Sequence, residues 1–216
     1  MIIFKPSKIL LWEKIKENSN FPFGIVLDAG FGGVDRYSKI FPRITKLITL
    51  DINEKCNPDI VGSVEAIPLE EQSMDSVICT QVIGDIPEPQ RAVKEFYRIL
   101  RKGGIVLLSE SFMNELHGEQ YDFLRFTNNG MLFLFEHNGF EVLKLERIGG
   151  FFSVIAQFKI RYFIERFNLY NCRFLNFLLA PFLKIYGYIM LFFDKLDTSA
   201  VNQKFAIGWL VIARKK

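Results

Sequence analysis

The stretch VLDAGFGG, residues 26–33, decides the fold of this chain. Its first residues are apolar and typical of a buried strand, and the strand ends in Asp28 just before a glycine-rich turn. Glycine lets a backbone turn tightly and approach a ligand without a Cβ in the way. The stretch therefore predicts a strand that delivers a ligand-binding loop, made of Asp28, Ala29, Gly30, Phe31 and Gly32.

Further short apolar runs follow along the chain, and they are continuous rather than alternating. This pattern is expected for strands of a parallel sheet that is covered on both faces. After the first strand at 24–30, the sequence predicts strands at 47–52, 60–61, 75–83, 104–111, 140–148 and 206–216.

Helical segments lie between these strands. Apolar residues recur every three or four positions in residues 88–101, and weaker helical patterns occupy 8–17 and 129–138. Strands that alternate with helices in this way indicate an α/β fold with a doubly wound sheet.

Composition excludes several classes of protein. Half of the 216 residues are apolar and 23 are Phe, which excludes a disordered chain. A net charge of +3 without an early basic run predicts no nucleic-acid partner. Three scattered cysteines offer neither a disulfide framework nor a C-x-x-C pair, so we expect no metal and a reducing cytoplasm. The N-terminal residues have no signal-peptide pattern.

Two further segments strengthen the ligand-binding interpretation of the first glycine turn. Asp51, followed by Ile52, ends the second strand about twenty residues beyond the turn, where a carboxylate can accept hydrogen bonds from both hydroxyls of a ribose. The loop 61–68, which contains Ser63 and Val64, follows the third strand and is expected to border the base.

In this order and spacing, four segments resemble the class I S-adenosylmethionine (SAM)-dependent methyltransferases, above all the small-molecule branch found in glycan and lipid biosynthesis clusters. The segments are VLDAGFG, ITLDIN, PDIVGSVEAIPLEEQSMDSVICTQVI and DFLRFTNNG. The resemblance covers residues 24–148. It implies SAM as cofactor and a Rossmann-like, seven-stranded, mostly parallel sheet with an antiparallel last strand. The domains expected are a SAM-binding core at 1–148, a hydrophobic helical insertion at 149–205 and the final strand at 206–216.

The chain departs from the family pattern at three positions. Val34 replaces the usual third glycine of the loop, so the turn is either looser or shifted by one residue. Ser63 stands where an Asp is usual, and a hydroxyl accepts a hydrogen bond from the adenine more weakly than a carboxylate. Asp85 takes the place of a histidine. Gln81, after the fourth strand, is a candidate for the methionine end of the cofactor or an ordinary loop residue.

Methyl transfer needs a base only when the acceptor atom carries a proton. The candidates lie where strands end on the cofactor face: Asp85, Glu110 and His117. The alternatives are a helix-start turn for Asp85 and an exposed loop histidine for His117. His137 is expected to cap the end of a helix.

Two charges interrupt the aromatic segment 122–127. Asp122 and Arg125 are candidate substrate-binding residues, because a guanidinium can hold a carboxylate or phosphate by two hydrogen bonds. The alternative is an ion pair between the two side chains, with Thr127 as the N-cap of the next helix.

The insertion 149–205 precedes the last strand, and the implied topology places it beside the substrate entrance. Residues 174–193 are almost wholly apolar, and basic side chains lie just before them. A single span would leave the last strand on the wrong side of a bilayer, so the insertion is read either as a peripheral element at the inner face of the membrane or as a lid or dimer interface.

The sequence therefore predicts a cytoplasmic SAM-dependent methyltransferase, with a small-molecule acceptor that is apolar, lipid-linked or glycan-linked. One alternative is an inactive relative that serves as a membrane-binding or partner-binding module. A nicotinamide-dependent oxidoreductase is disfavoured, because Asp35 stands where its fingerprint needs the last glycine of G-x-G-x-x-G.

Overall fold

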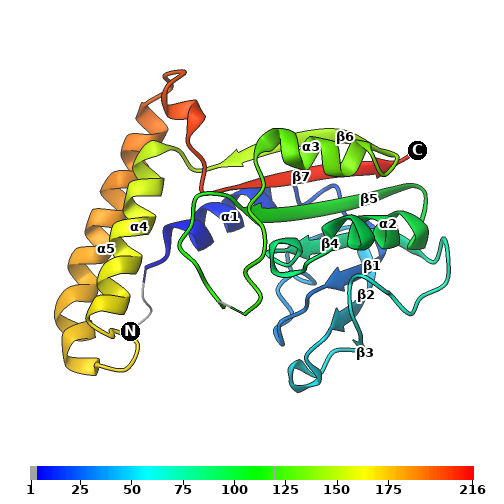
Figure 1. The fold of residues 1–216 in the computed structure, drawn as a ribbon, viewed down its shortest axis with the longest axis horizontal. Helices are drawn as coiled ribbons and strands as arrows, with labels where there is room; N and C mark the ends of the chain where they lie inside the picture. The colour runs from blue at the N-terminus through cyan, green and yellow to red at the C-terminus, as the bar shows by residue number, and fades with distance from the viewer. Residues whose placement is uncertain (1–3, 119) are drawn as a thin grey trace.

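The computed structural model describes residues 4–118 and 120–216. Within these ranges the chain forms one seven-stranded sheet (Figure 1). Its strands are β1 (Gly24–Ala29), β2 (Ile44–Asp51), β3 (Ile60–Val61), β4 (Met74–Thr80), β5 (Leu100–Ser111), β6 (Phe140–Ile148) and β7 (Gly208–Lys215).

The strands lie in the order β3-β2-β1-β4-β5-β7-β6. All pairs from β3 to β5 are parallel, whereas β7 lies antiparallel between β5 and β6. This confirms the predicted sheet with its antiparallel last strand. The strand order reverses between β1 and β4, and in such sheets ligands bind at the carboxyl ends of the strands at this reversal point.

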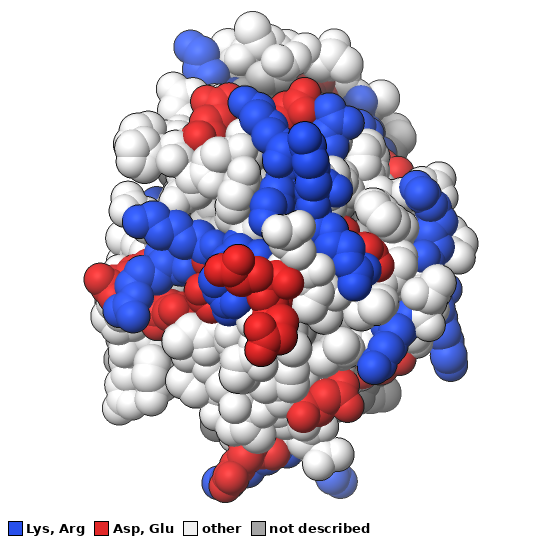
Figure 2. Space-filling model, turned by 90° about the vertical axis from the view of Figure 1, so that its right-hand side faces the viewer, with Lys and Arg blue, Asp and Glu red and all other residues white. Residues whose placement is uncertain are grey.

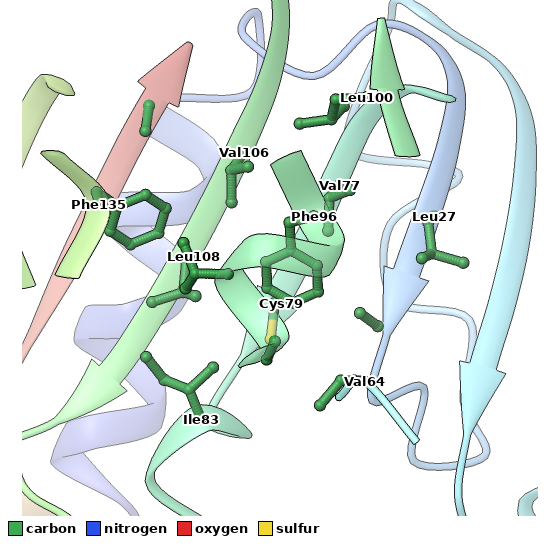
Figure 3. Packing of buried hydrophobic residues seen from close by; sticks show 14 of the residues in the cluster. Leu27, Val64, Val77, Cys79, Ile83, Phe96, Leu100, Val106, Leu108 and Phe135 are labelled. Atoms are coloured by element: carbon green, nitrogen blue, oxygen red, sulfur yellow. The ribbon is translucent and has the colours of Figure 1, made fainter. Parts of the chain in front are cut away.

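Helices cover both faces of the sheet. On one face, α2 (Pro89–Ile99) and α3 (Asn128–Glu136) enclose the largest apolar cluster, in which Phe96 and Phe135 are fully buried (Figure 3). On the other face lies α1 (Pro6–Glu17), whose Ile15 is buried in a second cluster. The two clusters account for the continuous apolar runs of the central strands, which are buried from both sides.

The connection from β1 to β2 contains turns rather than the helix expected between strands of a doubly wound sheet. Three glycines with positive φ begin this connection. Tyr37 and Phe41 then fill the space that a helix would cover, and both are almost fully buried beside Ile15 of α1. Aromatic side chains thus replace helical packing on this part of the sheet.

The insertion is a pair of antiparallel helices, α4 (Phe151–Arg166) and α5 (Arg173–Leu196), which stands at one end of the molecule (Figure 1). We call it the helical hairpin. Ile160 and Ile164 of α4 pack with Leu191 of α5 and with Phe4 in a third apolar cluster. A Cβ at Gly187 would lie 2.0 Å from the Phe4 ring, so this glycine lets the N-terminal segment dock on the hairpin.

Asp194 of α5 caps the first turn of α4. Its carboxylate accepts hydrogen bonds from the backbone N–H groups of Gly150 (2.9 Å), Phe152 (3.0 Å) and Ser153 (2.9 Å). A helix start otherwise leaves these donors without partners. The negative charge also interacts favourably with the helix dipole. One side chain therefore fastens the two helices to each other.

We expect Asp194→Ala to lower the free energy of unfolding by about 2 kcal/mol, because it removes a charged cap. Urea unfolding followed by circular dichroism measures the loss. Glu136→Ala, which removes an exposed carboxylate from α3, serves as the control and should change stability by less than about 0.5 kcal/mol. Equal effects of the two changes would contradict the capping role.

Candidate functional site

The glycine loop after β1 depends on backbone conformations that favour glycine. The φ angles of Gly30, Gly32 and Gly33 are +91°, +62° and +79°. A Cβ at Gly30 would lie 2.3 Å from Cγ2 of Val82, so the loop also packs closely against the segment after β4. Gly33, one position before Val34, also has a positive φ, and Val34 is 57% exposed.

Asp51, at the end of β2, holds this loop in place. Its Oδ2 accepts a hydrogen bond from the backbone N–H of Gly32 (2.8 Å), and its Oδ1 accepts one from Asn53 (2.8 Å). An ionised carboxylate has about four acceptor positions in all. The side chain can therefore shape the loop and still accept hydrogen bonds from a ligand.

A cavity of about 390 Å³ opens beside Asp51 at the carboxyl ends of the strands. It brings together residues that the sequence predicted from three separate segments. Its lining includes Gly30, Leu50, Asp51, Ile52, Gly62, Ser63, Val64, Gln81, Val82, Asp85, Ile86 and Tyr121. We call this cavity the β2-side cavity.

A second cavity of about 390 Å³ lies on the other side of the glycine loop and is covered by α1. We call it the α1-side cavity. Its lining includes Ser7, Lys8, Leu11, Trp12, Ile15, Gly30, Gly32, Arg36, Tyr37, Thr80, Gln81, Val82, Ser111, Asn114, Ile148, Ile207 and Gly208. Because both linings contain Gly30, Gln81 and Val82, the two cavities adjoin at these residues.

Gln81 is held firmly at this junction. Its φ of +57° lies in the left-handed region, which is costly for a residue with a side chain. The side-chain Oε1 accepts a hydrogen bond from the Ser111 hydroxyl (2.6 Å), and the backbone N–H donates to the carbonyl of Ser109 (2.9 Å). The structure thus places Gln81 at the point shared by the two cavities.

Asp28 is buried at the start of the glycine loop, with only 2% of its surface exposed. Its Oδ2 has no hydrogen-bond partner among the described residues. Burial raises the pKa of this carboxyl from 3.8 to about 7, although the nearby Arg36 guanidinium opposes the shift. A buried carboxylate oxygen of this kind is suited to a cationic group of a ligand.

Several residues of the α1-side cavity were not found from the sequence. Arg36 lies beside Gly32, and the Tyr37 hydroxyl lies 2.7 Å from the Thr80 hydroxyl. Burial raises the pKa of Tyr37 to about 12, so its proton stays in place at neutral pH. The sequence signal for these residues was their position directly after the glycines. That signal is weak, because the sequence does not reveal that turns replace a helix between β1 and β2.

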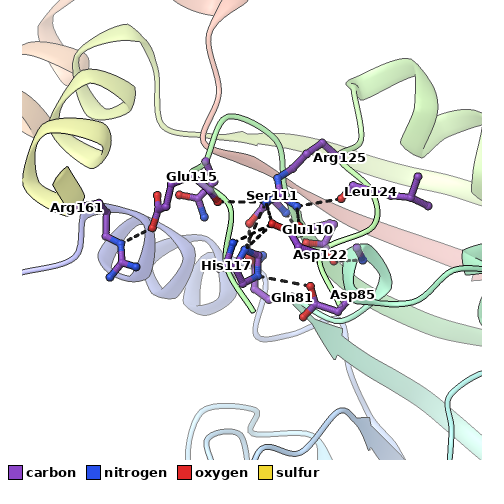
Figure 4. A network of polar contacts seen from close by, with 12 residues as sticks. Gln81, Asp85, Glu110, Ser111, Glu115, His117, Asp122, Leu124, Arg125 and Arg161 are labelled. Atoms are coloured by element: carbon purple, nitrogen blue, oxygen red, sulfur yellow. Dashed lines mark hydrogen bonds and ion pairs between the residues drawn. The ribbon is translucent and has the colours of Figure 1, made fainter. Parts of the chain in front are cut away.

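The loop after β5 brings His117 close to Asp85 (Figure 4). The Nε2 atom of His117 lies 3.5 Å from Oδ1 of Asp85, and Nδ1 lies 3.5 Å from Oδ2 of Asp122. Asp85 lines the β2-side cavity, and burial raises the pKa of its carboxyl. The His117 ring thus lies between two carboxylates, one of which lines a cavity, and this is a geometry in which a histidine can be oriented as a general base.

Asp122 and Arg125 form the ion pair that the sequence left open as the alternative to substrate binding. The Asp122 side chain is only 2% exposed, and hydrogen bonds from Arg125 hold its pKa below the usual range. Asp122 also accepts a hydrogen bond from the backbone N–H of His117 (2.9 Å). Oxygen and nitrogen atoms of Asp85, His117 and Asp122 lie within 4.8 Å of one another, but the Arg125 charge opposes a metal cation there.

Glu110 lies beneath the cavities and outside both of their linings, and it is 3% exposed. It accepts hydrogen bonds from the backbone N–H groups of Gly84 (2.9 Å) and Ser111 (2.7 Å), while burial raises its pKa to about 7. A Cβ at Gly84 would lie 2.9 Å from the Leu124 carbonyl. Glu110 therefore ties the end of β5 to the 3-10 turn Ile83–Asp85, and the carbonyl of Gly84 in that turn accepts hydrogen bonds from the backbone N–H groups of Phe123 and Leu124.

Two contacts connect this loop to the helical hairpin. Glu115 forms an ion pair with Arg161 of α4, and Asn114 accepts a hydrogen bond from the side chain of Gln157 (3.0 Å). The two helix-capping predictions nearby are confirmed: the Thr127 hydroxyl accepts from the backbone N–H of Gly130 (3.1 Å), and His137 is the C-cap residue of α3.

The two buried carboxyl groups predict how stability changes with pH. The pKa values of Asp28 and Glu110 are raised in the folded protein. Their contribution to the free energy of unfolding is therefore fully present below their ordinary pKa values of 3.8 and 4.5, and it is lost as the pH rises toward about 7. We expect the free energy of unfolding to fall by roughly 2–4 kcal/mol for each group between these limits. A group with a lowered pKa in the folded protein, such as Asp122, stabilises the fold above its ordinary pKa, and this stabilisation is lost only as the pH falls into the acidic range.

Urea unfolding at pH 5 and pH 8 measures this effect. Asp28→Asn removes one of the two titrating groups and should flatten the pH dependence while raising stability at pH 8. A free energy of unfolding that is constant or increases from pH 5 to pH 8 would contradict the assignment of these two carboxyl groups.

Comparison with known proteins agrees with this geometry. Residues 27–108 match the family model described as a methyltransferase domain. A malonyl-[acyl-carrier protein] O-methyltransferase from Yersinia pestis is 31% identical over 106 residues, which are 43% of this chain and 39% of that protein. A chloroplastic 2-methyl-6-phytyl-1,4-hydroquinone methyltransferase from Oryza sativa is 31% identical over 96 residues, 41% of this chain and 26% of that protein.

The similarity to these curated relatives is therefore confined to less than half of their length. Among solved structures, a putative methyltransferase from Bacillus halodurans has a TM-score of 0.57 at 17% identity, covering 94% of this chain and 97% of the other. At this identity the likeness concerns the fold alone.

Proposed function

We propose that this chain is a SAM-dependent methyltransferase that transfers a methyl group to a small-molecule acceptor, which is supported by the methyltransferase-domain match over residues 27–108. The observation that carries the proposal is the meeting of two cavities at Gly30, Gln81 and Val82. One cavity suits a nucleoside and the other suits an amino acid with an acceptor beside it.

The residues present fit this cofactor. Asp28 is in neither cavity lining, but its buried, unpartnered oxygen lies near Arg36 and Asp51 of the linings, so its negative charge favours a ligand that carries a sulfonium and an ammonium group. Arg36, on the wall of the α1-side cavity, suits the carboxylate of an amino acid. Asp51 keeps acceptor positions for two hydroxyls, and Ser63 and Val64 line the same β2-side cavity.

When bound, SAM supplies an electrophilic methyl group on its sulfur atom. The task of the protein is then to align the acceptor, to exclude water and to remove a proton where the acceptor has one. We assign proton removal to His117, because its loop also supplies Asn114 to the α1-side cavity that takes the acceptor. Asp85 and Asp122 orient the His117 ring from either side. Arg125 neutralises Asp122, and Glu110 fixes the position of the turn that bears Asp85.

The acceptor in this proposal is apolar, lipid-linked or glycan-linked. Much of the α1-side cavity is formed by large apolar side chains, among them Leu11, Trp12, Ile15, Ile148 and Ile207. The phytyl group in the name of the rice relative supports an apolar acceptor. Asn114 and Ser111 add polar groups on the same wall, which supports an acceptor with a hydroxyl or carbonyl at its reactive end.

An inactive relative would not need a pocket suited to the cofactor or an organised base. The unpartnered Asp28 oxygen and the His117 arrangement favour the enzyme over that alternative. Loss of the usual third glycine does not argue against activity, because Gly33 supplies the left-handed turn one position earlier than Val34.

An acceptor screen with SAM labelled in its methyl group tests the proposal. Hydroxylated isoprenoids, quinols, fatty-acyl carriers and glycolipids are supplied in turn, and label is followed into the organic phase. We expect transfer to at least one apolar class. Full cofactor binding without transfer to any class, under conditions in which S-adenosylhomocysteine is removed, would contradict the enzymatic proposal and favour the binding module.

A further inference from the structure

The outer face of α5 is unusually apolar for a surface exposed to solvent. The inner face of the helix packs on α4 through Leu179, Leu183 and Met190. The outer face is exposed at Phe174, Phe177, Leu178, Phe182, Ile185, Tyr188, Ile189, Phe192, Phe193 and Leu196. A surface helix of a soluble protein normally has polar residues on that side. A continuous apolar face of this kind marks an interaction surface.

One edge of this face carries a regular row of positive charge. Arg173, Lys184 and Lys195 are exposed and recur every eleven residues, which is close to three turns of an α-helix. They therefore lie almost in line along the helix. Lys195 also lies 3.8 Å from Glu13, a loose contact between two exposed side chains.

Acidic side chains are missing from the exposed part of α5. The only acidic residue in Arg173–Leu196 is Asp194, which is half-buried and caps the start of α4. The opposite end of the molecule differs, because there Lys and Arg alternate closely with Asp and Glu (Figure 2). The exposed part of α5 therefore carries aromatic and aliphatic side chains, and its charged side chains are all basic.

This combination fits a lipid surface better than a protein surface of mixed charge. An interfacial helix places its apolar face at the boundary of the acyl chains and keeps Lys and Arg at the level of the anionic headgroups. Phe and Tyr are suited to that boundary as well. The helix is long and apolar enough to span a bilayer, with 17% of its most apolar window buried. However, the chain returns from its C-terminal end, through the 3-10 turn Asn202–Lys204, to β7 in the same sheet as β5.

We propose that the outer face of α5 docks, parallel to the surface, on a bilayer that contains anionic phospholipids. The row Arg173, Lys184 and Lys195 contacts the headgroups, and the exposed Phe, Ile, Leu and Tyr side chains enter the interface. Gly187 and Phe4 on the inner side hold the N-terminal segment against α5, so docking needs no rearrangement of the core.

Docking of α5 on a membrane would also place the proposed methyl-transfer site near the bilayer. The helical hairpin stands at the end of the molecule toward which the carboxyl ends of the parallel strands point (Figure 1). The two cavities open at that edge, and residues Ser7 and Asn114 of the α1-side cavity bond to Gln157 of α4. A docked hairpin therefore brings an apolar acceptor in the membrane close to the site. Membrane binding itself requires neither cofactor nor turnover.

Vesicle flotation tests the proposal with the full chain. We expect strong binding to vesicles made of equal parts phosphatidylcholine and phosphatidylglycerol, weak binding to phosphatidylcholine alone, and release by high salt. The triple change Arg173→Gln, Lys184→Gln and Lys195→Gln should lower the partition coefficient by roughly a hundredfold, because each basic residue near an anionic surface contributes about a factor of five.

The matched control removes the same charge elsewhere. Lys46→Gln, Lys94→Gln and Lys102→Gln alter exposed residues of the sheet domain and should leave vesicle binding nearly intact. A second variant, Phe177→Gln with Ile185→Gln and Phe192→Gln, should abolish binding even at low salt. All three substituted side chains are more than half exposed, and circular dichroism and SAM affinity verify that the variant is folded.

The proposal would be overturned if the α5 triple variant and the sheet-domain triple variant lost vesicle binding equally. That result would show a general electrostatic attraction of the protein to the vesicle rather than docking through α5. Sedimentation of the unaltered chain without lipid provides the other decisive result. A stable dimer that the Phe177, Ile185 and Phe192 changes dissociate, with no preference for anionic vesicles, would assign the face to a second copy of the chain. SAM affinity measured on the same samples shows separately whether the proposed function holds.

Discussion

Replacement of Asp51 by alanine is expected to weaken the binding of SAM by more than a hundredfold. The carboxylate has acceptor positions free for two ribose hydroxyls, and each such hydrogen bond contributes about 1.5 kcal/mol or more, so about 3 kcal/mol is lost. The change also removes the hydrogen bond to the backbone N–H of Gly32, which shapes the glycine loop. Isothermal titration calorimetry measures the dissociation constant.

Two comparisons make this result specific. Glu54→Ala removes the same charge from an exposed residue just beyond β2 and should leave the affinity unchanged. Asp51→Asn retains one oxygen and should give an intermediate affinity. An Asp51→Ala protein that binds SAM as tightly as the parent would refute the role of this residue in the cofactor site.

Replacement of His117 by alanine is expected to lower the rate of methyl transfer about 100- to 1,000-fold for an acceptor that carries a proton on the reacting atom. The ring is in neither cavity lining and lies 3.5 Å from Asp85, which lines the β2-side cavity, and 3.5 Å from Asp122, so its removal leaves both linings intact. The affinity for SAM should therefore stay the same. Single-turnover kinetics with labelled SAM separates the chemical step from binding.

The other histidine of the chain provides the control. His137 stacks on Phe133 at the end of α3, away from both cavities, and His137→Ala should leave the rate unchanged. The pH–rate profile should differ from that of the parent in the His117 variant and match it in the His137 variant. A His117 variant with the parental rate and the parental pH profile would exclude His117 as the base.

The central sheet could be predicted from the sequence, because its strands are continuous apolar runs that end in glycine or acidic residues. Asp51 and the loop containing Ser63 follow their strands directly, so the topology alone brings them to one cavity. The antiparallel position of β7 was available only through the family resemblance. Local patterns also sufficed for the helix caps at Thr127 and His137.

Other features depend on contacts between distant segments. The turns after β1 are stabilised by Tyr37 and Phe41 packing on α1, and no local pattern reveals that a helix is missing there. Glu110 was a candidate base because it ends a strand on the cofactor face, and only the structure shows that it is buried and accepts a hydrogen bond from the backbone N–H of Gly84. Arg36 reaches the α1-side cavity only because the loop folds back past Gly32.

The role of the hairpin also depends on burial. The sequence shows an apolar segment at 174–193, and only the packing on α4 shows which side of the helix is covered. The ion pair between Glu115 and Arg161 joins the helical hairpin to the loop of His117, so the hairpin is in direct contact with the loop that bears the candidate base.

Calorimetric titration of the unaltered chain with SAM is the decisive measurement for the cofactor site. We expect saturable binding of one SAM molecule per chain, with a dissociation constant between about 1 μM and 1 mM, the range in which enzymes commonly bind their substrates. S-adenosylhomocysteine should compete for the same site. The absence of saturable binding by a folded sample at millimolar SAM would contradict the account.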